Sequence, residues 1–291
     1  MMSDCSSFAG VGSHAVKSTL QAKIHYVSVM DLAARDDLLI ARKNGVATLT
    51  LNRPDRRNAL TPAYWHAIAQ AVTALDLDES VRAIVLTGAG TAFCAGFDLR
   101  GLSDESDEER QVRLSKASSF VSMLPPHDTP IIAAVNGPAV TGGLELCLAA
   151  DLIVASTAAR FADTHIKVGA IPGGGVTVFL PERIGPGRAR LMSLTGQFVD
   201  AETACSWGRC DLVVEPEALL ATAFELAESI ATFSPEHVAA IRSLYAESTE
   251  FGGVAALANE QQRSKQWMAD RFSRRALADN QAQIIAEGSQ S

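Results

Sequence analysis

One acidic side chain stands out because its neighbours are almost all apolar. Glu145 is flanked by Leu144 and Leu146 within the stretch 136–151, N-G-P-A-V-T-G-G-L-E-L-C-L-A-A-D. A glutamate is rarely buried without a partner or a purpose, and a carboxylate beside polarising N–H groups can act as a general base. The alternative is that Glu145 only favours a helix start through the helix dipole.

Glycines in two places can supply N–H groups to a ligand. Gly142 and Gly143 bring the backbone into a short apolar helix that begins near Leu144, and free N–H groups at a helix start form a site for negative charge. A second stretch, F-C-A-G-F-D-L at 93–99, can present another N–H group at Gly96-Phe97. Taken alone, that second stretch is more often only a tight turn.

Two further groups of residues have types suited to chemistry. His165 lies in an apolar, glycine-rich context shortly before I-P-G-G-G at 171–175, and histidine exchanges protons near neutral pH. The alternative is a hydrogen-bonded structural histidine. The loop N-R-P-D-R-R-N at 52–58 holds three arginines within five residues. These arginines either hold phosphate or only make the loop soluble.

The elements that must position these residues alternate between strand and helix, which predicts the α/β class. Asn44-Gly45 predicts a hairpin between strands at 38–43 and 46–51, and Thr61-Pro62 predicts the start of a helix that ends near Leu75. A charged stretch at 103–110 precedes a helix that ends near Leu124. Further strands are expected at 83–87, 131–135, 152–155 and from 160. Strand signals fade after Pro181, and helices are expected at 188–195, 201–208 and 216–233, from Ser234-Pro235, and twice within 251–286.

Composition excludes several classes of protein. The chain has 291 residues, 47% of them hydrophobic, and a net charge of −8 without a long basic run, which disfavours nucleic-acid and anionic-membrane binding. No apolar stretch approaches the ~18 residues of a membrane span. Five scattered cysteines without a C-x-x-C pair indicate neither a disulfide framework nor a zinc site, and we expect a cytoplasmic protein. Phe93 replaces the third glycine of a dinucleotide fingerprint, so no redox cofactor is indicated.

Four blocks taken together resemble the crotonase superfamily, also called the enoyl-CoA hydratase/isomerase family. They are L-N-R-P-D-R-R-N-A-L at 51–60, A-I-V-L-T-G-A-G-T-A-F-C-A-G-F-D-L at 83–99, I-A-A-V-N-G-P-A-V-T-G-G-L-E-L at 132–146 and F-A-D-T-H-I-K-V-G-A-I-P-G-G-G at 161–175. The resemblance implies a spiral core of repeated ββα turns, followed by helices that assemble homotrimers or dimers of trimers. We therefore expect a poorly ordered N-terminal extension at 1–37, the spiral core at 38–232 and a helical trimerisation region at 233–291.

The resemblance also implies which residues do the chemistry. Members of the family bind acyl-CoA thioesters and stabilise a thioester enolate with two backbone N–H groups, which by position are those of Phe97 and Gly142. Hydratases use two glutamates to add water. The first matches Glu145, but the second position is occupied by His165, which can still perform acid–base work.

The same comparison by position places the coenzyme A part of the substrate near Arg56, Arg57 and Ala95. Asp98 and Asp163 are interpreted as structural or supporting residues. The sequence V-T-V-F at 176–179 replaces the glycine and polar residues common in hydratases, so the acyl-chain length does not follow from the resemblance.

The expected function is hydration of a 2-enoyl-CoA, with no metal and with coenzyme A only as part of the substrate. Two alternatives remain open because of His165. One is another acyl-CoA enolate reaction, namely isomerisation, decarboxylation or thioester hydrolysis. The other is an acyl-CoA-binding protein with little catalysis.

Overall fold

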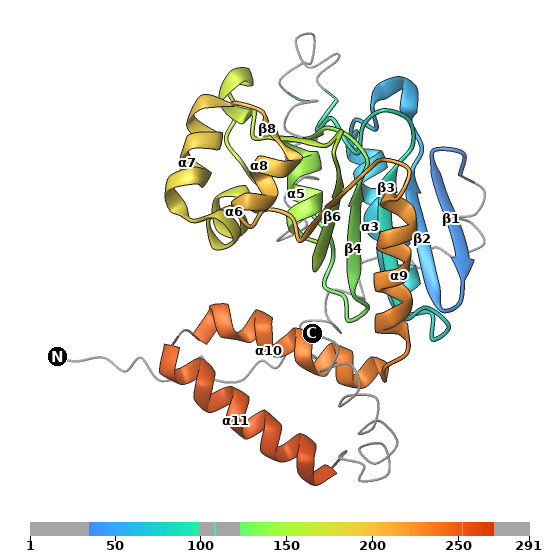
Figure 1. Cartoon of the computed structure of the whole chain (residues 1–291), viewed down its shortest axis with the longest axis vertical. Helices are drawn as coiled ribbons and strands as arrows, with labels where there is room; N and C mark the ends of the chain where they lie inside the picture. The colour runs from blue at the N-terminus through green and yellow to red at the C-terminus, as the bar shows by residue number, and fades with distance from the viewer. Residues whose placement is uncertain (1–34, 99–107, 109–122, 252, 271–291) are drawn as a thin grey trace, which may run out of the picture. The chain divides into compact units, whose positions relative to one another are not determined.

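The computed structural model describes residues 35–98, 108, 123–251 and 253–270 (Figure 1). The expected extension up to residue 34, the charged stretch at 103–110 except residue 108, and most of the helix predicted before Leu124 lie outside these residues. The described elements are β1 (Leu38–Lys43), β2 (Val46–Leu51), the 3₁₀ helix η1 (Pro54–Arg56), α3 (Pro62–Asp76), β3 (Ala83–Gly88), β4 (Ile131–Val135), β5 (Ala139–Val140), α5 (Gly142–Leu148), β6 (Leu152–Ser156), β7 (Arg160–Ala162), the 3₁₀ helix η2 (His165–Val168), α6 (Val176–Ile184), α7 (Pro186–Thr195), β8 (Val199–Asp200), α8 (Ala201–Ser206), β9 (Leu212–Val214), α9 (Leu219–Ala231), α10 (Pro235–Phe251) and α11 (Gly253–Asp270).

The first two strands form the predicted hairpin. They pair antiparallel, with Leu38 opposite Leu51 and Lys43 opposite Val46. Asn44 and Gly45 have φ values of 51° and 78°, and a two-residue hairpin turn of the commonest kind needs positive φ at both positions. The local sequence is therefore enough to define this turn and its register.

A six-stranded sheet with the order β1-β2-β3-β4-β6-β9 forms the centre of the core. Every pair after the first is parallel, and parallel neighbours need long crossovers, which explains the alternation of strands and helices. Strand signals fade after Pro181, but the structure has two more strands there, β8 and β9, which were not predicted. These strands have two and three residues, which is too short to show an alternating pattern.

Helices cover both faces of this sheet (Figure 1). α9 packs on one face, where Ala223 and Ala227 lie in a cluster with Val85 of β3. Ile84 and Leu86, the neighbours of Val85, point to the opposite face and pack with side chains of α3 and α5. Since both faces are covered, the parallel strands are apolar throughout rather than alternating.

A second, smaller sheet has the order β5-β7-β8. β5 and β7 pair parallel, with Ala139 opposite Phe161 and Val140 opposite Ala162. Both strands are short, yet β5 leads directly into the segment that carries Glu145 and β7 into the segment that carries His165. The small sheet therefore decides how these two segments meet.

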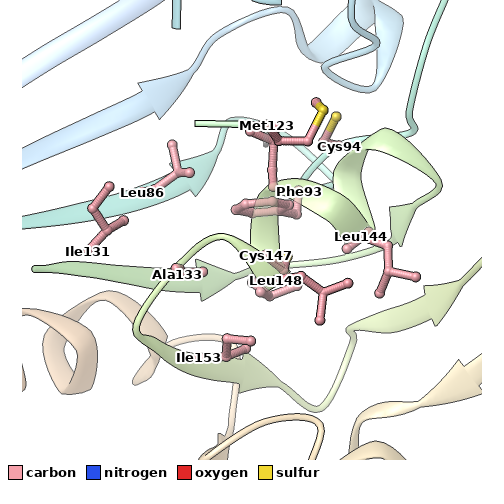
Figure 2. Packing of buried hydrophobic residues seen from close by; sticks show 14 of the residues in the cluster. Leu86, Phe93, Cys94, Met123, Ile131, Ala133, Leu144, Cys147, Leu148 and Ile153 are labelled. Carbon is pink, nitrogen blue, oxygen red and sulfur yellow. The ribbon is translucent and has the colours of Figure 1, made fainter. Parts of the chain in front are cut away.

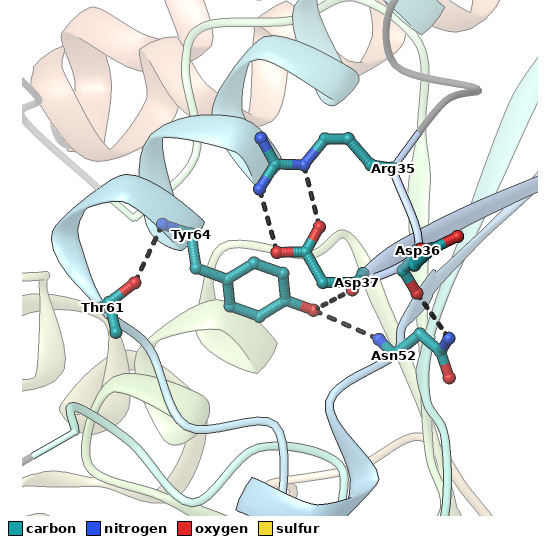
Figure 3. Close-up of polar contacts among 6 residues, drawn as sticks. All are labelled: Arg35, Asp36, Asp37, Asn52, Thr61 and Tyr64. Atoms are coloured by element: carbon teal, nitrogen blue, oxygen red, sulfur yellow. Dashed lines mark hydrogen bonds and ion pairs between the residues drawn. The ribbon is translucent and has the colours of Figure 1, made fainter.

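The start of α3 confirms its predicted cap and anchors the hairpin (Figure 3). The hydroxyl of Thr61 accepts the N–H of Tyr64 at 3.2 Å, and Pro62 occupies the first helical turn. The hydroxyl of Tyr64 donates to the carbonyl of Asp37 at 2.8 Å and accepts the N–H of Asn52 at 3.2 Å. One buried phenol thus joins the first turn of the helix to the chain segments on either side of the hairpin.

Asn58 joins two loops that lie far apart in the sequence. It is fully buried and has a φ of 56°. Its Nδ2 donates to the carbonyls of Ala89, Ala92 and Phe93 at 3.0, 2.8 and 3.1 Å, while its Oδ1 accepts the N–H of Arg53 at 2.8 Å. This amide therefore holds the loop after β2 against the turn that leads to Phe97.

The chain divides into two compact units, Met1–Val238 and Ala239–Ser291. Within the second unit, Glu247 of α10 accepts hydrogen bonds from Asn259 and Arg263 of α11, and Arg263 also donates to Ser243. The predicted boundary at residue 233 and the trimerisation role stay predictions. Across the part of the chain that the structure describes, no helix is both long and apolar enough to cross a membrane.

We expect Asn58→Asp to destabilise the fold strongly. The new carboxylate would face three carbonyl oxygens that lose their donor in the interior, which should lower the free energy of unfolding by at least about 3 kcal/mol. Urea unfolding at pH 7 measures the change. Asn52→Asp is the matched control, because Asn52 is only half-buried and its hydrogen bond to the Asp36 carbonyl is exposed to solvent, so we expect a loss of about 1 kcal/mol or less. If both substitutions lowered the free energy of unfolding equally, Asn58 would not have the structural role described here.

Candidate active site

Apolar packing carries Glu145 into the interior. All seven residues of α5 are buried, and Figure 2 shows Leu144, Cys147 and Leu148 packed among apolar side chains, with Phe93 beside them. Burial of a large apolar side chain stabilises a fold by about 1.5–3 kcal/mol. The helix is therefore firmly placed, and Glu145 is left with an exposed fraction of only 1%.

The carboxylate of Glu145 has one partnered oxygen and one unpartnered oxygen. Oε1 accepts the N–H of Gly174 at 2.8 Å, whereas Oε2 is buried and has no hydrogen-bond partner among the described residues. Burial raises the pKa of Glu145, although the Gly174 N–H and the nearby His165 act in the opposite direction. A carboxyl group with a raised pKa and a free oxygen is suited to exchanging a proton with a bound molecule.

Gly174 must be a glycine to reach this carboxylate. A Cβ atom at this position would lie 2.7 Å from Glu145 Oε2 and 2.7 Å from Met123 Cγ. The glycine-rich stretch at 171–175 was predicted to form a loop near His165, but its contact with Glu145 was not predicted. Loops that approach side chains so closely cannot be recognised from spacing alone.

The turns after β5 and β7 bring Glu145 and His165 into one site. The strand pairing continues beyond β5, because the N–H of Thr141 donates to the carbonyl of Ala162 at 2.9 Å. The hydroxyls of Thr141 and Thr164 then share a hydrogen bond of 2.6 Å. His165 is close enough to Glu145 to influence its pKa, so the two predicted acid–base residues are neighbours in space.

Thr141 has a strained backbone at this junction. Its φ and ψ are 52° and −109°, a conformation that is normally left to glycine at the first central position of a tight turn. Positive φ is unusual for a β-branched residue and costs about 1–3 kcal/mol. The strand pairing and the hydroxyl contact with Thr164 hold the residue in this conformation.

His165 is paired with a carboxylate. Its Nδ1 lies 2.6 Å from Asp163 Oδ1, and its backbone N–H donates to the same oxygen at 3.2 Å. The side chains of His165 and Asp163 are 9% and 1% exposed. Asp163 was interpreted as a structural or supporting residue because it does not occupy the usual acid–base position of the family, and its contact with the ring depends on how the 3₁₀ helix η2 folds.

Phe97 and Gly142 have backbone N–H groups free for a ligand. Gly96 accepts from the N–H of Leu60 at 2.7 Å and Asp98 donates to Leu60 at 2.8 Å, so the intervening N–H of Phe97 points to the other side. None of the backbone hydrogen bonds recorded for the described residues uses the N–H of Phe97 or Gly142.

The absence of Cβ atoms at three glycines lets these N–H groups lie close together. A Cβ on Gly96 would lie 3.4 Å from the nitrogen of Gly142, and a Cβ on Gly142 would lie 3.1 Å from the ring of Phe97. Gly143 allows this approach, since a Cβ there would lie 2.1 Å from the carbonyl oxygen of Cys94. The two N–H groups predicted as an oxyanion site therefore lie next to each other.

The predicted coenzyme A residues lie on the adjoining loop. Arg56 and Arg57 are exposed, and the carbonyl of Arg57 accepts the N–H of Ala95 at 2.9 Å. The third arginine of the loop has a different role, because Arg53 Nη1 donates to the carbonyl of Ala59 at 2.6 Å and its guanidinium lies over the ring of Tyr64. Only Arg56 and Arg57 extend into solvent.

Arg209 is a residue of the site region that sequence analysis missed. It is fully buried, lies over the ring of Phe161 at 4.9 Å and donates to the carbonyl of Leu144 at 3.4 Å. Burial lowers its pKa to about 10. Arg209 thus connects β7 with α5, and no local pattern predicts an arginine that packs like an apolar side chain.

The sequence of this chain is similar to those of known proteins. A sequence model of the family described as "Enoyl-CoA hydratase/isomerase" matches residues 41–279. "Probable enoyl-CoA hydratase 1, peroxisomal" of Arabidopsis thaliana is 36% identical over 237 residues, which are 81% of this chain and 88% of that protein. "1,2-epoxyphenylacetyl-CoA isomerase" of Escherichia coli (strain K12) is 37% identical over 194 residues, covering 65% of this chain and 74% of that protein.

A solved structure is also similar over most of its length. The crystal structure of an enoyl-CoA hydratase from Mycobacterium tuberculosis H37Rv has a TM-score of 0.67 and 39% sequence identity. The similarity covers 81% of this chain and 100% of that chain. The crotonase fold expected from the sequence is confirmed.

The strain at Thr141 predicts a difference between two small substitutions. Thr141→Gly and Thr141→Ala both lose the contact with Thr164, but only alanine keeps a Cβ at positive φ. We expect the glycine variant to be more stable than the alanine variant by about 1 kcal/mol. Chemical unfolding at one protein concentration measures the difference, and an alanine variant at least as stable as the glycine variant would rule out the proposed strain.

Proposed function

The chain belongs to the enoyl-CoA hydratase/isomerase family, and we propose that it adds water to the double bond of a 2-enoyl-CoA. The observation that carries this proposal is the carboxylate of Glu145, which is buried, has a raised pKa and keeps one oxygen without a partner among the described residues. It lies on the helix whose first N–H group, that of Gly142, is free to bind an oxyanion.

The proposed reaction begins with polarisation of the thioester. The N–H groups of Phe97 and Gly142 bind the thioester oxygen and stabilise the negative charge that develops on it when the enolate forms. Loss of one such donor costs about 2.7–4 kcal/mol of transition-state stabilisation. Both donors belong to the backbone, so their positions are set by the close packing of Gly96 and Gly142.

Glu145 and His165 then divide the proton transfers. Glu145 takes a proton from water, whose oxygen bonds to the β-carbon, and His165 gives a proton to the α-carbon of the enolate. A positioned acid–base group contributes about 10²–10⁴-fold to a rate. The two groups are neighbours because β5 and β7 pair in parallel.

The coenzyme A part of the substrate is proposed to lie along the loop of Arg56, Arg57 and Ala95. The two arginines are exposed, and a guanidinium can bind phosphate through two parallel hydrogen bonds. No separate cofactor is part of this proposal, because coenzyme A enters with the substrate. The cytoplasmic location also stays a proposal, and the Arabidopsis relative is named as peroxisomal.

Assembly into trimers is proposed from exposed apolar side chains. Several lie on η2 and the segments that follow it, namely Ile166, Val168, Ile171, Val178, Leu194 and Phe198. In the second unit, Tyr245 and Val254 are 75% and 85% exposed. Exposed apolar side chains that gather on neighbouring segments can mark contacts with another chain, which supports a homotrimer or a dimer of trimers.

Isomerisation is the second candidate, and His165 is the observation that favours it. An imidazole held by Asp163 can move a proton between carbon atoms without a water molecule. The E. coli relative is named as an isomerase of a CoA compound. The products of turnover therefore need to be identified, since hydration adds water to the substrate and isomerisation does not.

We expect Glu145→Gln to reduce turnover severely. The amide cannot take a proton from water, so kcat should fall by about 10²–10⁴-fold, measured as loss of the enoyl-thioester ultraviolet absorbance with short, medium and long acyl chains. Acyl-CoA binding, measured by calorimetry, should remain. Glu202→Gln, at an exposed position in α8, is the matched control. Unchanged turnover in Glu145→Gln would refute the mechanism, and binding without turnover in the unmodified protein would favour a binding role.

The same substitution should increase stability in a pH-dependent way. Because burial raises the pKa of Glu145 in the folded state, ionisation of this carboxyl destabilises the fold as the pH rises through that pKa. Below the ordinary glutamate pKa of about 4.3, both folded and unfolded states are protonated and the effect disappears. Glu145→Gln should therefore unfold at higher urea concentration than the unmodified protein near pH 7, with a difference that shrinks toward pH 4. A pH-independent difference would contradict this assignment.

A further inference from the structure

Asp163 makes its shortest contact with the ring of His165. The separation of 2.6 Å between Oδ1 and Nδ1 is much shorter than the 3.2 Å between Oδ1 and the backbone nitrogen. The other oxygen, Oδ2, is buried without a hydrogen-bond partner among the described residues. A carboxylate that only capped the backbone turn would have no need to hold the ring so closely.

The charge of Asp163 decides which ring nitrogen carries the proton. Burial alone would raise the pKa of Asp163, but the hydrogen bond from the His165 ring, the nearby Ser193 hydroxyl and the His165 backbone N–H together outweigh burial and hold that pKa below its ordinary value. The ionised carboxylate can only accept hydrogen bonds. The contact at 2.6 Å therefore places a proton on Nδ1, and the lone pair of a neutral ring lies on Nε2.

The second nitrogen is available for chemistry. In the described part of the chain, the hydrogen bonds of His165 use its backbone groups and Nδ1, and none uses Nε2. The ring is buried within the influence of Glu145. Nε2 is thus the ring atom left to meet a substrate or a water molecule.

We propose that Asp163 is a positioning residue that fixes His165 in the tautomer protonated at Nδ1, so that Nε2 is the atom that exchanges a proton with the substrate. The catalytic part of this inference rests on the function proposed above, whereas the tautomer can be tested without it. The pair Asp163–His165 then takes the place that a second glutamate has in the family's hydratases.

The proton transfers balance with this assignment. In hydration, an O–H bond of water breaks as Glu145 takes the proton and the oxygen bonds to the β-carbon. The Nε2–H bond of the imidazolium breaks next, and its proton joins the α-carbon through the electron pair of the enolate. The ring is left neutral with Nδ1–H still bonded to Asp163, and the proton on Glu145 returns to Nε2 for the next cycle.

Nuclear magnetic resonance of the full chain labelled with ¹⁵N-histidine tests the tautomer directly. With His165→Gln used for assignment, we expect a protonated Nδ1, an unprotonated Nε2 at a pH where the ring is neutral, and a far-downfield Nδ1–H proton. His127, whose Nδ1 lies 2.8 Å from the carbonyl of Pro125, is an internal reference. A proton found on Nε2 of the neutral His165 ring would overturn the proposal, and this result needs no folded variant of Asp163.

Asp163→Asn supplies the second measurement. Because an amide can donate as well as accept, the downfield proton should disappear and the Nε2–H tautomer should become populated. We expect kcat to fall about 10–100-fold, part of the contribution of a positioned acid–base group, with little change in KM. Asp200→Asn is the matched control, since Asp200 caps α8 through Thr203 at an exposed position and should leave kcat unchanged.

The outcomes separate this proposal from the proposed function. The expected tautomer in a protein that does not hydrate enoyl-CoA would refute hydration but retain the role of Asp163 in fixing the ring. Normal hydration together with an unchanged kcat in Asp163→Asn would overturn the role of Asp163 and leave the function intact. A fall in kcat without any change in the tautomer would assign Asp163 a structural role only.

Discussion

The parallel pairing of β5 with β7 is the constraint on which the site depends. It involves only two residue pairs, Ala139 with Phe161 and Val140 with Ala162, yet it sets the register of everything that follows both strands. Thr141 extends the pairing by one hydrogen bond, and its hydroxyl then meets that of Thr164. A slip of one residue would turn the side chains of one strand to the opposite face and separate Glu145 from His165.

The surroundings of the two carboxyl groups in the site shift their pKa values in opposite directions. Glu145 lies in an apolar helix, and burial raises its pKa, whereas Asp163 is bonded to His165 and its pKa is lowered. In the mechanism that we propose, these two carboxyl groups therefore have different tasks, with Glu145 exchanging a proton and Asp163 remaining ionised. The large apolar core that includes Leu144 and Cys147 supplies the stability that unsatisfied oxygens and a strained Thr141 reduce.

Local signals predicted most of the elements in this chain. Asn44-Gly45 defines a hairpin because both residues tolerate positive φ, and Thr61-Pro62 defines a helix start because the hydroxyl accepts an orphan N–H group. The apolar run Ile131–Val135 predicted a buried strand, and the acidic residue after two glycines predicted a carboxylate at a helix start. The four sequence blocks predicted the fold, which the comparisons confirm.

The sequence by itself thus determined the α/β class, the hairpin, the first helix cap and the identity of the candidate acid–base residues, because each of these depends on neighbours a few positions away. Only the tertiary structure decided that Gly174 holds Glu145, that Asp163 holds the ring of His165, that Asn58 joins two loops and that Arg209 packs against Phe161. Most of these contacts join residues far apart in the chain, and the exception, Asp163 with His165, depends on a turn that packing shapes. Such contacts cannot be predicted from spacing and residue type, because they depend on the register of short strands and on which side chains become buried.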